Sequence, residues 1–178
     1  CKEKRLPLVL CTTGLSQCQL EKVQELSETV PVLRSANMSL GVNLLLKLVK
    51  EGAKVLGMSG FDMEIVEKHH RRKLDAPSGT AVALAESINE AMGGACHFVY
   101  DRSQVRRPRD EKEIGISSVR GGTIVGEHDV IFAGMDEVVT LSHQAFSRGI
   151  FAKGALAAAK FLAGRKPGMY DMSDVIGL

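Results

Sequence analysis

The hydrophobic pattern of the first 38 residues predicts a strand, a helix and a second strand. Residues 7–11 form a continuous apolar run, which is typical of a parallel strand that is covered on both faces. Ser16 and Gln19 then have the spacing of a capping box, and apolar residues repeat behind them at helical spacing. Pro31 opens another short apolar run. Together these segments predict one βαβ unit.

A long helix is predicted over residues 39–56. Its apolar residues cover most of its circumference, so we expect it to be buried between two layers. Residues 62–67 alternate between polar and apolar side chains and predict a half-buried strand. A second helix is predicted over residues 80–92, with Ser78 or Thr80 as its cap.

The remaining segments predict further strands that are joined mostly by short turns, which favours antiparallel or mixed pairing. These strands are expected at residues 96–100, 114–119, 123–125, 129–132 and 137–141. Residues 102–112 are charged and contain Pro108, so they are predicted to form a surface loop. A last helix is expected over 151–163 and ends at Gly164, after which Pro167 and Gly168 turn the chain into a short tail.

Composition narrows the possible functions. The 178 residues carry 23 basic and 21 acidic side chains, a net charge of +2, and only 4% of them are aromatic. This balance argues against a nucleic acid partner, and the lack of a long apolar run argues against a membrane partner or signal peptide. The four cysteines show no metal-binding spacing, so we expect no metal site, reduced thiols and a cytoplasmic location.

The strongest chemical signal lies in residues 67–80, where two imidazoles and several cations directly precede a predicted helix start. His69 and His70 are expected at the carboxyl end of a strand, where sites gather in open α/β sheets. The neighbouring cations are expected to lower the pKa of these imidazoles and to favour proton transfer there and at Lys73. The segment is therefore a candidate anion site. A solvated basic loop explains the same residues equally well.

Two further features fit an anion site. Gly79 lets a ligand approach the backbone, and the hydroxyls of Ser78 and Thr80 with the helix N–H groups could bind a carboxylate, although a tight turn with a cap explains them too. Arg148 is a candidate for a second carboxylate, although a lone Arg is more often a surface residue. No GxGxxG sequence or P-loop occurs, which argues against a complete Rossmann domain within these residues.

The segment Glu67-Lys68-His69-His70-Arg71-Arg72-Lys73-Leu74-Asp75-Ala76-Pro77-Ser78-Gly79-Thr80-Ala81 closely resembles the signature of the dihydrodipicolinate reductase family. Segments 12–14, 35–43, 119–128 and 142–148 reinforce the resemblance, which runs over essentially the whole chain. The family usually has Gly at the position of Cys11. The resemblance implies an α/β protein in which a mixed-sheet α+β substrate domain is flanked by the remnant of a Rossmann-like nucleotide-binding domain.

The resemblance also implies domain boundaries. Residues 1–38 are expected to be the C-terminal remnant of the dinucleotide-binding domain. Residues 39–148 are expected to bind substrate and form the oligomer, and residues 149–178 to return to the nucleotide domain. The chain starts without Met and without the family's first βα units, so we expect it to lack the N-terminal part of that domain.

The implied activity is reduction of dihydrodipicolinate by NADPH or NADH in lysine and diaminopimelate biosynthesis, by a cytoplasmic homo-oligomer, expected to be a tetramer. In that family His69 would be the catalytic acid/base and Lys73 the proton donor. The small dicarboxylate substrate would be held by His70, Lys73, Ser78, Gly79, Thr80 and Arg148. The cofactor would contact Cys11, Thr12, Thr13, Ser35, Ala36, Asn37 and Met38. The alternative is a non-catalytic oligomeric fragment that binds a dicarboxylate without useful cofactor affinity.

Overall fold

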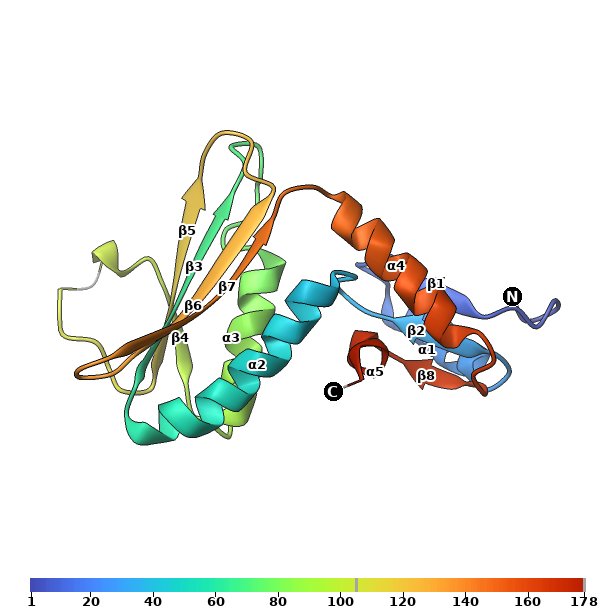
Figure 1. The fold of residues 1–178 in the computed structure, drawn as a ribbon, viewed down its shortest axis with the longest axis horizontal. Helices are drawn as coiled ribbons and strands as arrows, with labels where there is room; N and C mark the ends of the chain where they lie inside the picture. The colour runs from blue at the N-terminus through green and yellow to red at the C-terminus, as the bar shows by residue number, and fades with distance from the viewer. Residues whose placement is uncertain (105, 178) are drawn as a thin grey trace. The chain divides into compact units, whose positions relative to one another are not determined.

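The computed structural model describes residues 1–104 and 106–177, so Val105 of the expected loop and Leu178 of the tail lie outside the described residues. The chain divides into two compact units (Figure 1). Unit 1 comprises Cys1–Leu44 and Arg148–Leu178, and unit 2 comprises Leu45–Ser147. Unit 1 contains a parallel sheet and unit 2 a mixed sheet, which confirms the expected α/β class.

Unit 1 is built on a three-stranded parallel sheet in the order β1-β2-β8. Its elements are β1 (Leu8–Leu10), α1 (Gln17–Ser27), β2 (Pro31–Arg34), α4 (Gly149–Leu162), β8 (Gly168–Tyr170) and α5 (Met172–Ile176). The predicted capping box of α1 is confirmed, because Ser16 N donates to Gln19 Oε1 at 2.8 Å and Gln19 N to Ser16 Oγ at 3.4 Å. The core of this unit consists of Leu33, Met38, Ala158, Leu162 and Met172.

The prediction of a short tail after Gly164 was wrong. Gly168–Tyr170 add a third strand to the sheet beside β2, and Asp171 caps α5 by accepting from Ser173 N and Asp174 N. A three-residue strand and a five-residue helix are too short for hydrophobic periodicity to reveal. The Asp171 and Asp174 spacing was the available signal, because their side chains form a capping box.

Unit 2 is built on a five-stranded mixed sheet in the order β4-β5-β3-β6-β7 (Figure 1). β5 lies parallel to β3 and β4, whereas β6 lies antiparallel to β3 and β7. The strands are β3 (Asp62–His69), β4 (His97–Tyr100), β5 (Glu113–Arg120), β6 (Gly126–Ala133) and β7 (Val138–Ala145). Helix α3 (Gly79–Ala91) covers one face of the sheet, as does the part of α2 (Leu40–Leu56) that lies in unit 2, and two short 3₁₀ turns follow Leu56 and Asp101.

The core of unit 2 lies between these helices and the sheet. Its largest fully buried side chains include Ile65 of β3, Leu84 and Ile88 of α3, and Phe132 of β6. β3 alternates between buried and half-buried residues along its whole length, which confirms the predicted strand. The alternation places Met63, Ile65, Glu67 and His69 on the helix-covered face.

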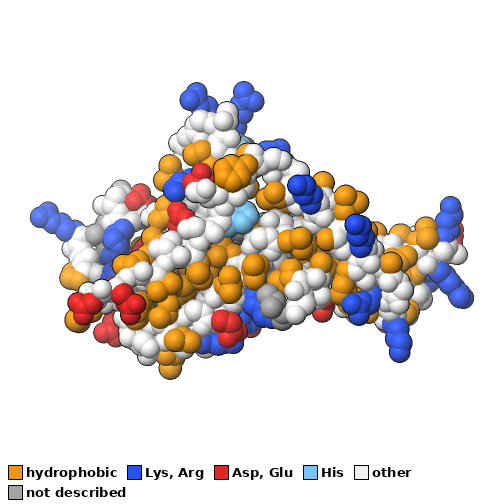
Figure 2. Space-filling view, viewed as in Figure 1, with side chains coloured by type: hydrophobic (Ala, Val, Ile, Leu, Met, Phe, Trp, Pro, Cys, Tyr) orange, Lys and Arg blue, Asp and Glu red, His pale blue; other side chains and the backbone are white. Residues whose placement is uncertain are grey.

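Two sequence predictions for unit 2 were wrong. Residues 123–125 form part of the turn between β5 and β6 instead of a strand, because the ladder of β6 with β3 and β7 begins only near Gly126. Helix α2 is not buried all round, since Leu44, Leu48 and Val55 remain 39%, 45% and 66% exposed. Figure 2 shows apolar side chains at the surface over this helix. The helix packs with one face only, and the pattern of its own residues could not indicate how many layers surround it.

The loop between β4 and β5 is fastened to the sheet by arginines. Arg109 pairs with Asp62 and Glu64 and donates to the carbonyls of Met63 and Glu113, at 3.3 and 2.6 Å. Arg102 pairs with the buried carboxylate of Glu113. The surface loop expected here is therefore held to β3 and β5 at two points.

Candidate active site

The candidate site of unit 2 forms at the carboxyl end of β3. His69 ends the strand and is 8% exposed, and His70 follows it directly. This confirms the predicted position of both imidazoles. Ser78 caps α3, as predicted, through a hydrogen bond from Ala81 N to its Oγ at 3.2 Å. The start of α3 is therefore joined to the end of β3 by the nine-residue connection that carries Lys73.

A buried carboxylate organises this strand end. Glu67 has no exposed surface, and its Oε2 lies 2.5 Å from His69 Nδ1. Arg120 at the end of β5 binds the same carboxylate with both terminal nitrogens, at 2.7 and 2.8 Å. Ser78 N also donates to Glu67 Oε1 at 3.1 Å. The two strand ends and the helix start are thus tied to one side chain.

Sequence reasoning missed both Glu67 and Arg120 as functional residues. Arg120 could not be found locally, because it reaches Glu67 across 53 positions through the parallel pairing that sets His69 opposite Arg120. A signal for Glu67 did exist. Strand alternation places Glu67 on the same face as Ile65 and His69, and a buried carboxylate on an apolar face needs partners.

The electrostatics keep Glu67 charged. Burial opposes its ionisation, but hydrogen bonds from Arg120, Ser118 and His69 outweigh burial and hold the pKa of Glu67 at about 2. Burial lowers the pKa of His69, Glu67 acts against this, and the charges of Lys73 and Arg120 lower it further. The predicted direction for His69 is therefore confirmed, although burial contributes more than neighbouring cations do.

A second histidine lies beside the first. The rings of His69 and His128 approach edge to face, with centroids 5.2 Å apart, and His128 Nε2 lies 3.0 Å from Ser78 Oγ. Burial, together with the charge of His69, lowers the pKa of His128 to about 4. His143 of β7 pairs in register with His128, and burial lowers the pKa of His143 as well. The side chain of Ser78 is therefore buried and hydrogen bonded to both α3 and His128.

The cations of this segment point in different directions. Lys73 Nζ lies 2.9 Å from Asp75 Oδ1 and is largely covered. Lys68 lies on the opposite face of the sheet from His69, where it pairs with Glu127 at 3.2 Å and Asp129 at 3.0 Å. Arg71 and Arg72 are exposed, at the end of unit 2 where β3 and β5 finish and where Lys and Arg side chains project in Figure 2. Among these four cations, Lys73 is the one whose charge lowers the pKa of His69.

The residues expected to contact the cofactor lie in unit 1. Cys11, Thr12 and Thr13 follow β1, and residues 35–38 follow β2. Because β1 and β2 are parallel neighbours, both segments lie at the carboxyl edge of the same sheet, the edge at which nucleotides bind in such folds. Arg148 also belongs to unit 1, where it precedes α4. The structure thus brings together the two cofactor segments in one unit and His69, His70, Lys73, Ser78, Gly79 and Thr80 in the other.

The segment after β2 is rigidly hydrogen bonded. Ser35 Oγ donates to Asn37 O at 2.8 Å, Asn37 Oδ1 accepts from Ser39 N at 2.9 Å, and Asn43 Nδ2 donates to Asn37 O at 2.8 Å. Met38 is 5% exposed and belongs to the core of unit 1. Its side chain therefore packs into the core of unit 1, and its carbonyl oxygen lies against Gly154 of α4.

Comparison with known proteins identifies the relatives of this chain. Residues 41–176 match the family described as dihydrodipicolinate reductase, C-terminus, and residues 1–38 match dihydrodipicolinate reductase, N-terminus. The chain belongs to the dihydrodipicolinate reductase family. Reductases of this family are oxidoreductases that use a nicotinamide cofactor.

Individual relatives agree with this assignment. The chain is 57% identical over 174 residues to 4-hydroxy-tetrahydrodipicolinate reductase of Caldanaerobacter subterraneus, with 98% of the chain and 68% of the relative covered. It is 50% identical over 178 residues to the same enzyme of Clostridium botulinum, with 99% and 70% covered. The chain therefore spans about two thirds of the length of these relatives.

A solved structure supports the fold of this dihydrodipicolinate reductase family member. The dipicolinate-bound dihydrodipicolinate reductase from Paenisporosarcina sp. TG-14 matches with a TM-score of 0.79 and 27% sequence identity. The match covers 98% of this chain and 66% of that chain. The Paenisporosarcina protein therefore shares the fold of this chain and binds dipicolinate, a small dicarboxylate.

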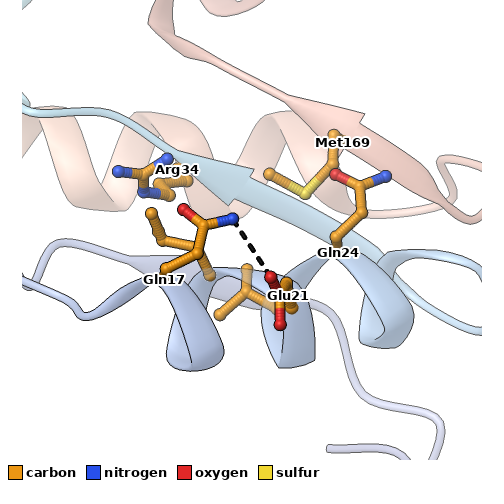
Figure 3. Close-up of a pocket in the computed structure, with 7 residues that line it drawn as sticks. Gln17, Glu21, Gln24, Arg34 and Met169 are labelled. Carbon is orange, nitrogen blue, oxygen red and sulfur yellow. Dashed lines mark hydrogen bonds between the residues drawn. The ribbon is translucent and has the colours of Figure 1, made fainter.

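Two cavities lie outside the cluster around His69. One of about 280 Å³ in unit 1 is bordered by α1, β2 and β8, with Gln17 donating to Glu21 at its rim, 3.2 Å away, and Arg34 and Met169 on the other side (Figure 3). The other, of about 380 Å³, is lined by Ala76, Pro77, Tyr100, Asp101 and residues 116–118. Neither His69 nor Lys73 is among the described residues that line these two cavities, so both cavities are separate from the candidate site.

The described residues carry no metal-binding cluster. Within residues 1–104 and 106–177, no group of three or more His, Cys, Asp or Glu side chains is arranged to hold a metal ion. Nor does any helix in the same ranges combine the length and apolar character that crossing a membrane requires.

Proposed function

We propose that the chain supplies the substrate-binding and proton-transfer site of a reductase that converts hydroxy-tetrahydrodipicolinate to tetrahydrodipicolinate in lysine and diaminopimelate biosynthesis. The observation that carries the proposal is the pairing of His69 with Glu67 at the end of β3, where the charge of Lys73 also acts on His69, within the segment that resembles the family signature. A buried carboxylate that holds an imidazole next to an ammonium group is an arrangement suited to proton transfer.

The residues divide the chemistry between them. Lys73 Nζ can give a proton to the enamine that forms when the conjugated cyclic imine accepts a hydride, and His69 can act as the acid/base through Nε2. The positive charge of Lys73 and the N-terminus of α3 at Gly79 and Thr80 stabilise negative charge on a bound dicarboxylate. His70 and Arg148 are further proposed contacts to the dicarboxylate.

The carboxyl edge of the unit 1 sheet suits a nicotinamide cofactor. Thr12, Thr13 and Ser35 place hydroxyl groups after two adjacent parallel strands, and a Cβ added at Gly14 would meet no atom within 4 Å. The residues present therefore fit one end of a dinucleotide, with Cys11, Ala36, Asn37 and Met38 as the other contacts. NADPH or NADH, when bound, would supply the hydride.

The proposal includes a homo-oligomer, a tetramer, in the cytoplasm. β7 is an edge strand of eight residues, and pairing or packing between copies would cover such an edge. The four cysteines are unpaired, and three of them are exposed, which suits a reducing compartment. Light scattering of the purified chain tests the assembly, and a monomer would contradict it.

Binding of pyridine-2,6-dicarboxylate, followed by calorimetry, tests the site itself. We expect salt-sensitive binding that Lys73→Ala and Thr80→Val each weaken by about 1–3 kcal/mol, the range for a lost hydrogen bond to a charged group. Lys68→Ala is the matched control, because Lys68 lies on the opposite face of the sheet. Absent binding, or equal losses for Lys73→Ala and Lys68→Ala, would overturn the proposed site.

A kinetic test addresses the chemistry. In the active enzyme, His69→Gln should lower turnover by roughly 100-fold or more while cofactor binding stays close to wild type, as expected of a proton-transfer residue. Turnover within a few-fold of wild type would remove His69 from the mechanism.

A further inference from the structure

We infer that Glu67 and Arg120 form a positioning pair for His69: Glu67 fixes the imidazole with Nε2 as its free proton-accepting atom, and Arg120 offsets part of the charge that Glu67 would otherwise impose on that imidazole. The inference rests on the proposed role of His69. It concerns two residues that would not touch the substrate and would act through His69 alone.

The contacts leave Glu67 no freedom to move. Its carboxylate accepts from Arg120 at both oxygens, from Ser78 N at 3.1 Å, and from His69 Nδ1 at 2.5 Å. Arg120 is fixed in turn, because it also donates to Asp75 O at 2.6 Å and Val119 O at 2.8 Å. Three elements therefore hold the carboxylate in one orientation toward His69.

This geometry selects the tautomer of His69. An ionised carboxylate can only accept hydrogen bonds, so the ring nitrogen facing Glu67 must carry the hydrogen. The low pKa of Glu67, about 2, supports its ionised state at neutral pH. Neutral His69 is then protonated at Nδ1 and carries its lone pair at Nε2. In the absence of such a partner the two tautomers of an imidazole compete, and only one of them presents a base at Nε2.

Arg120 determines how strongly His69 holds a second proton. A bare buried carboxylate beside an imidazole favours the imidazolium form and makes it a poor acid at neutral pH. The two-pronged ion pair with Arg120 offsets part of that charge, because the cation of Arg120 lowers the pKa of His69 whereas Glu67 raises it. The other groups that face His69 are Lys73 from the connecting segment and His128 from β6, with Asp75 paired to Lys73 and His143 paired in register with His128.

A merely structural ion pair makes a different prediction from a positioning pair. Removing either member of a structural pair loosens the same strand ends and should therefore shift the pKa of His69 in the same direction. Removing the two members of a positioning pair should shift the pKa of His69 in opposite directions. Glu67→Gln leaves the cation of Arg120 near His69 and lowers the pKa of His69, whereas Arg120→Met leaves the anion of Glu67 and raises it.

Nuclear magnetic resonance of the 178-residue chain with nitrogen-15-labelled histidine measures both the tautomer and the pKa of His69 without requiring activity. The chain has five histidines, and the His69→Gln variant assigns the signals of His69. In the unmodified chain we expect His69 to be protonated at Nδ1 and unprotonated at Nε2 near pH 7. A ring protonated at Nε2 instead would overturn the inference, and this measurement needs no variant that must fold.

Titration of the variants gives the second readout. We expect the pKa of His69 to fall by about one pH unit in Glu67→Gln and to rise by about one in Arg120→Met. Lys68→Met, which removes two ion pairs from the opposite face of the same strand, should leave the pKa of His69 unchanged. Shifts of equal sign, or none in Arg120→Met, would overturn the role of the pair. Calorimetric titration of the unmodified chain with pyridine-2,6-dicarboxylate is a separate measurement. If the proposed function fails while the inference holds, the chain will not bind the dicarboxylate, but His69 will still be protonated at Nδ1.

Discussion

His128 Nε2 and Ser78 Oγ lie 3.0 Å apart in a site where both side chains are buried. The contact joins β6 to the first turn of α3, because the same hydroxyl oxygen accepts from Ala81 N. His128 also faces His69, so a proton on His128 would place positive charge beside a second imidazole and near Lys73. The start of α3 is thus built around a histidine that is neutral in the folded protein.

Stability should therefore fall in mild acid. The folded pKa of His128, about 4, lies below its ordinary value of 6.5, so the unfolded chain binds this proton more tightly. The contribution of neutral His128 to the free energy of unfolding is complete above pH 6.5 and is lost as the pH falls toward 4. Between pH 7 and pH 5 the loss from His128 is about 2 kcal/mol. Glu67, with a pKa of about 2, contributes its own loss only below about pH 4.5.

Urea unfolding at pH 7 and pH 5 checks this prediction. The difference between the two free energies of unfolding should shrink clearly in His128→Gln. It should stay as in the unmodified chain in His97→Gln, since His97 is an exposed residue of β4. An unchanged difference in His128→Gln would show that His128 does not carry the acid sensitivity.

Gly126 is predicted to keep the space at His69 Nε2 open. A Cβ at Gly126 would lie 3.1 Å from Nε2 and 3.4 Å from Cδ2 of His69. Gly126→Ala should displace the ring or crowd its reactive nitrogen, so turnover of the active enzyme should fall by roughly 100-fold, the effect of misplacing a catalytic group by about 1 Å. Unchanged turnover would mean that the ring adjusts without cost.

The same substitution at a neighbouring glycine provides the control. A Cβ at Gly121 would meet no atom within 4 Å, so Gly121→Ala should have little effect on turnover. Thermal unfolding of both variants separates crowding at the site from general destabilisation. Gly126→Ala should unfold within a few degrees of the unmodified chain while it loses activity.

The sequence predicted local features of the site and missed those that depend on strand pairing. The alternation of polar and apolar side chains over residues 62–67 was sufficient to predict β3 and the position of His69 at its end. The hydroxyl of Ser78 was sufficient to predict the start of α3. Arg120 was beyond this reasoning, because only the register of β3 with β5 brings it to Glu67. The exposed side of α2 was missed for a related reason, since the apolar pattern of a helix does not specify how many layers pack against it.

The arginine contacts of the loop between β4 and β5 give a prediction on local stability. Arg109→Met removes hydrogen bonds to two backbone carbonyls and the pairing with Asp62 and Glu64, so the free energy of unfolding should fall by about 1–3 kcal/mol. Hydrogen exchange measured by mass spectrometry should increase around Asp110 and Glu113. Arg107→Met, at an exposed position, should change neither quantity, and equal effects of the two variants would contradict the fastening role of Arg109.

Gly154 is predicted to control the segment that follows β2. A Cβ at this position of α4 would collide with Met38 O, which is backbone and cannot rotate away. Gly154→Ala must therefore shift α4 or residues 35–38, and we expect a loss of about 1–3 kcal/mol, as for other overpacked cores. Since that segment carries the proposed cofactor contacts, NAD(P)H binding measured by fluorescence titration should weaken as well. Gly121→Ala again serves as the control in unfolding and titration. If Gly154→Ala behaved like Gly121→Ala in both unfolding and titration, the close packing of α4 on Met38 would have no role in shaping the proposed cofactor site at the carboxyl edge of the unit 1 sheet.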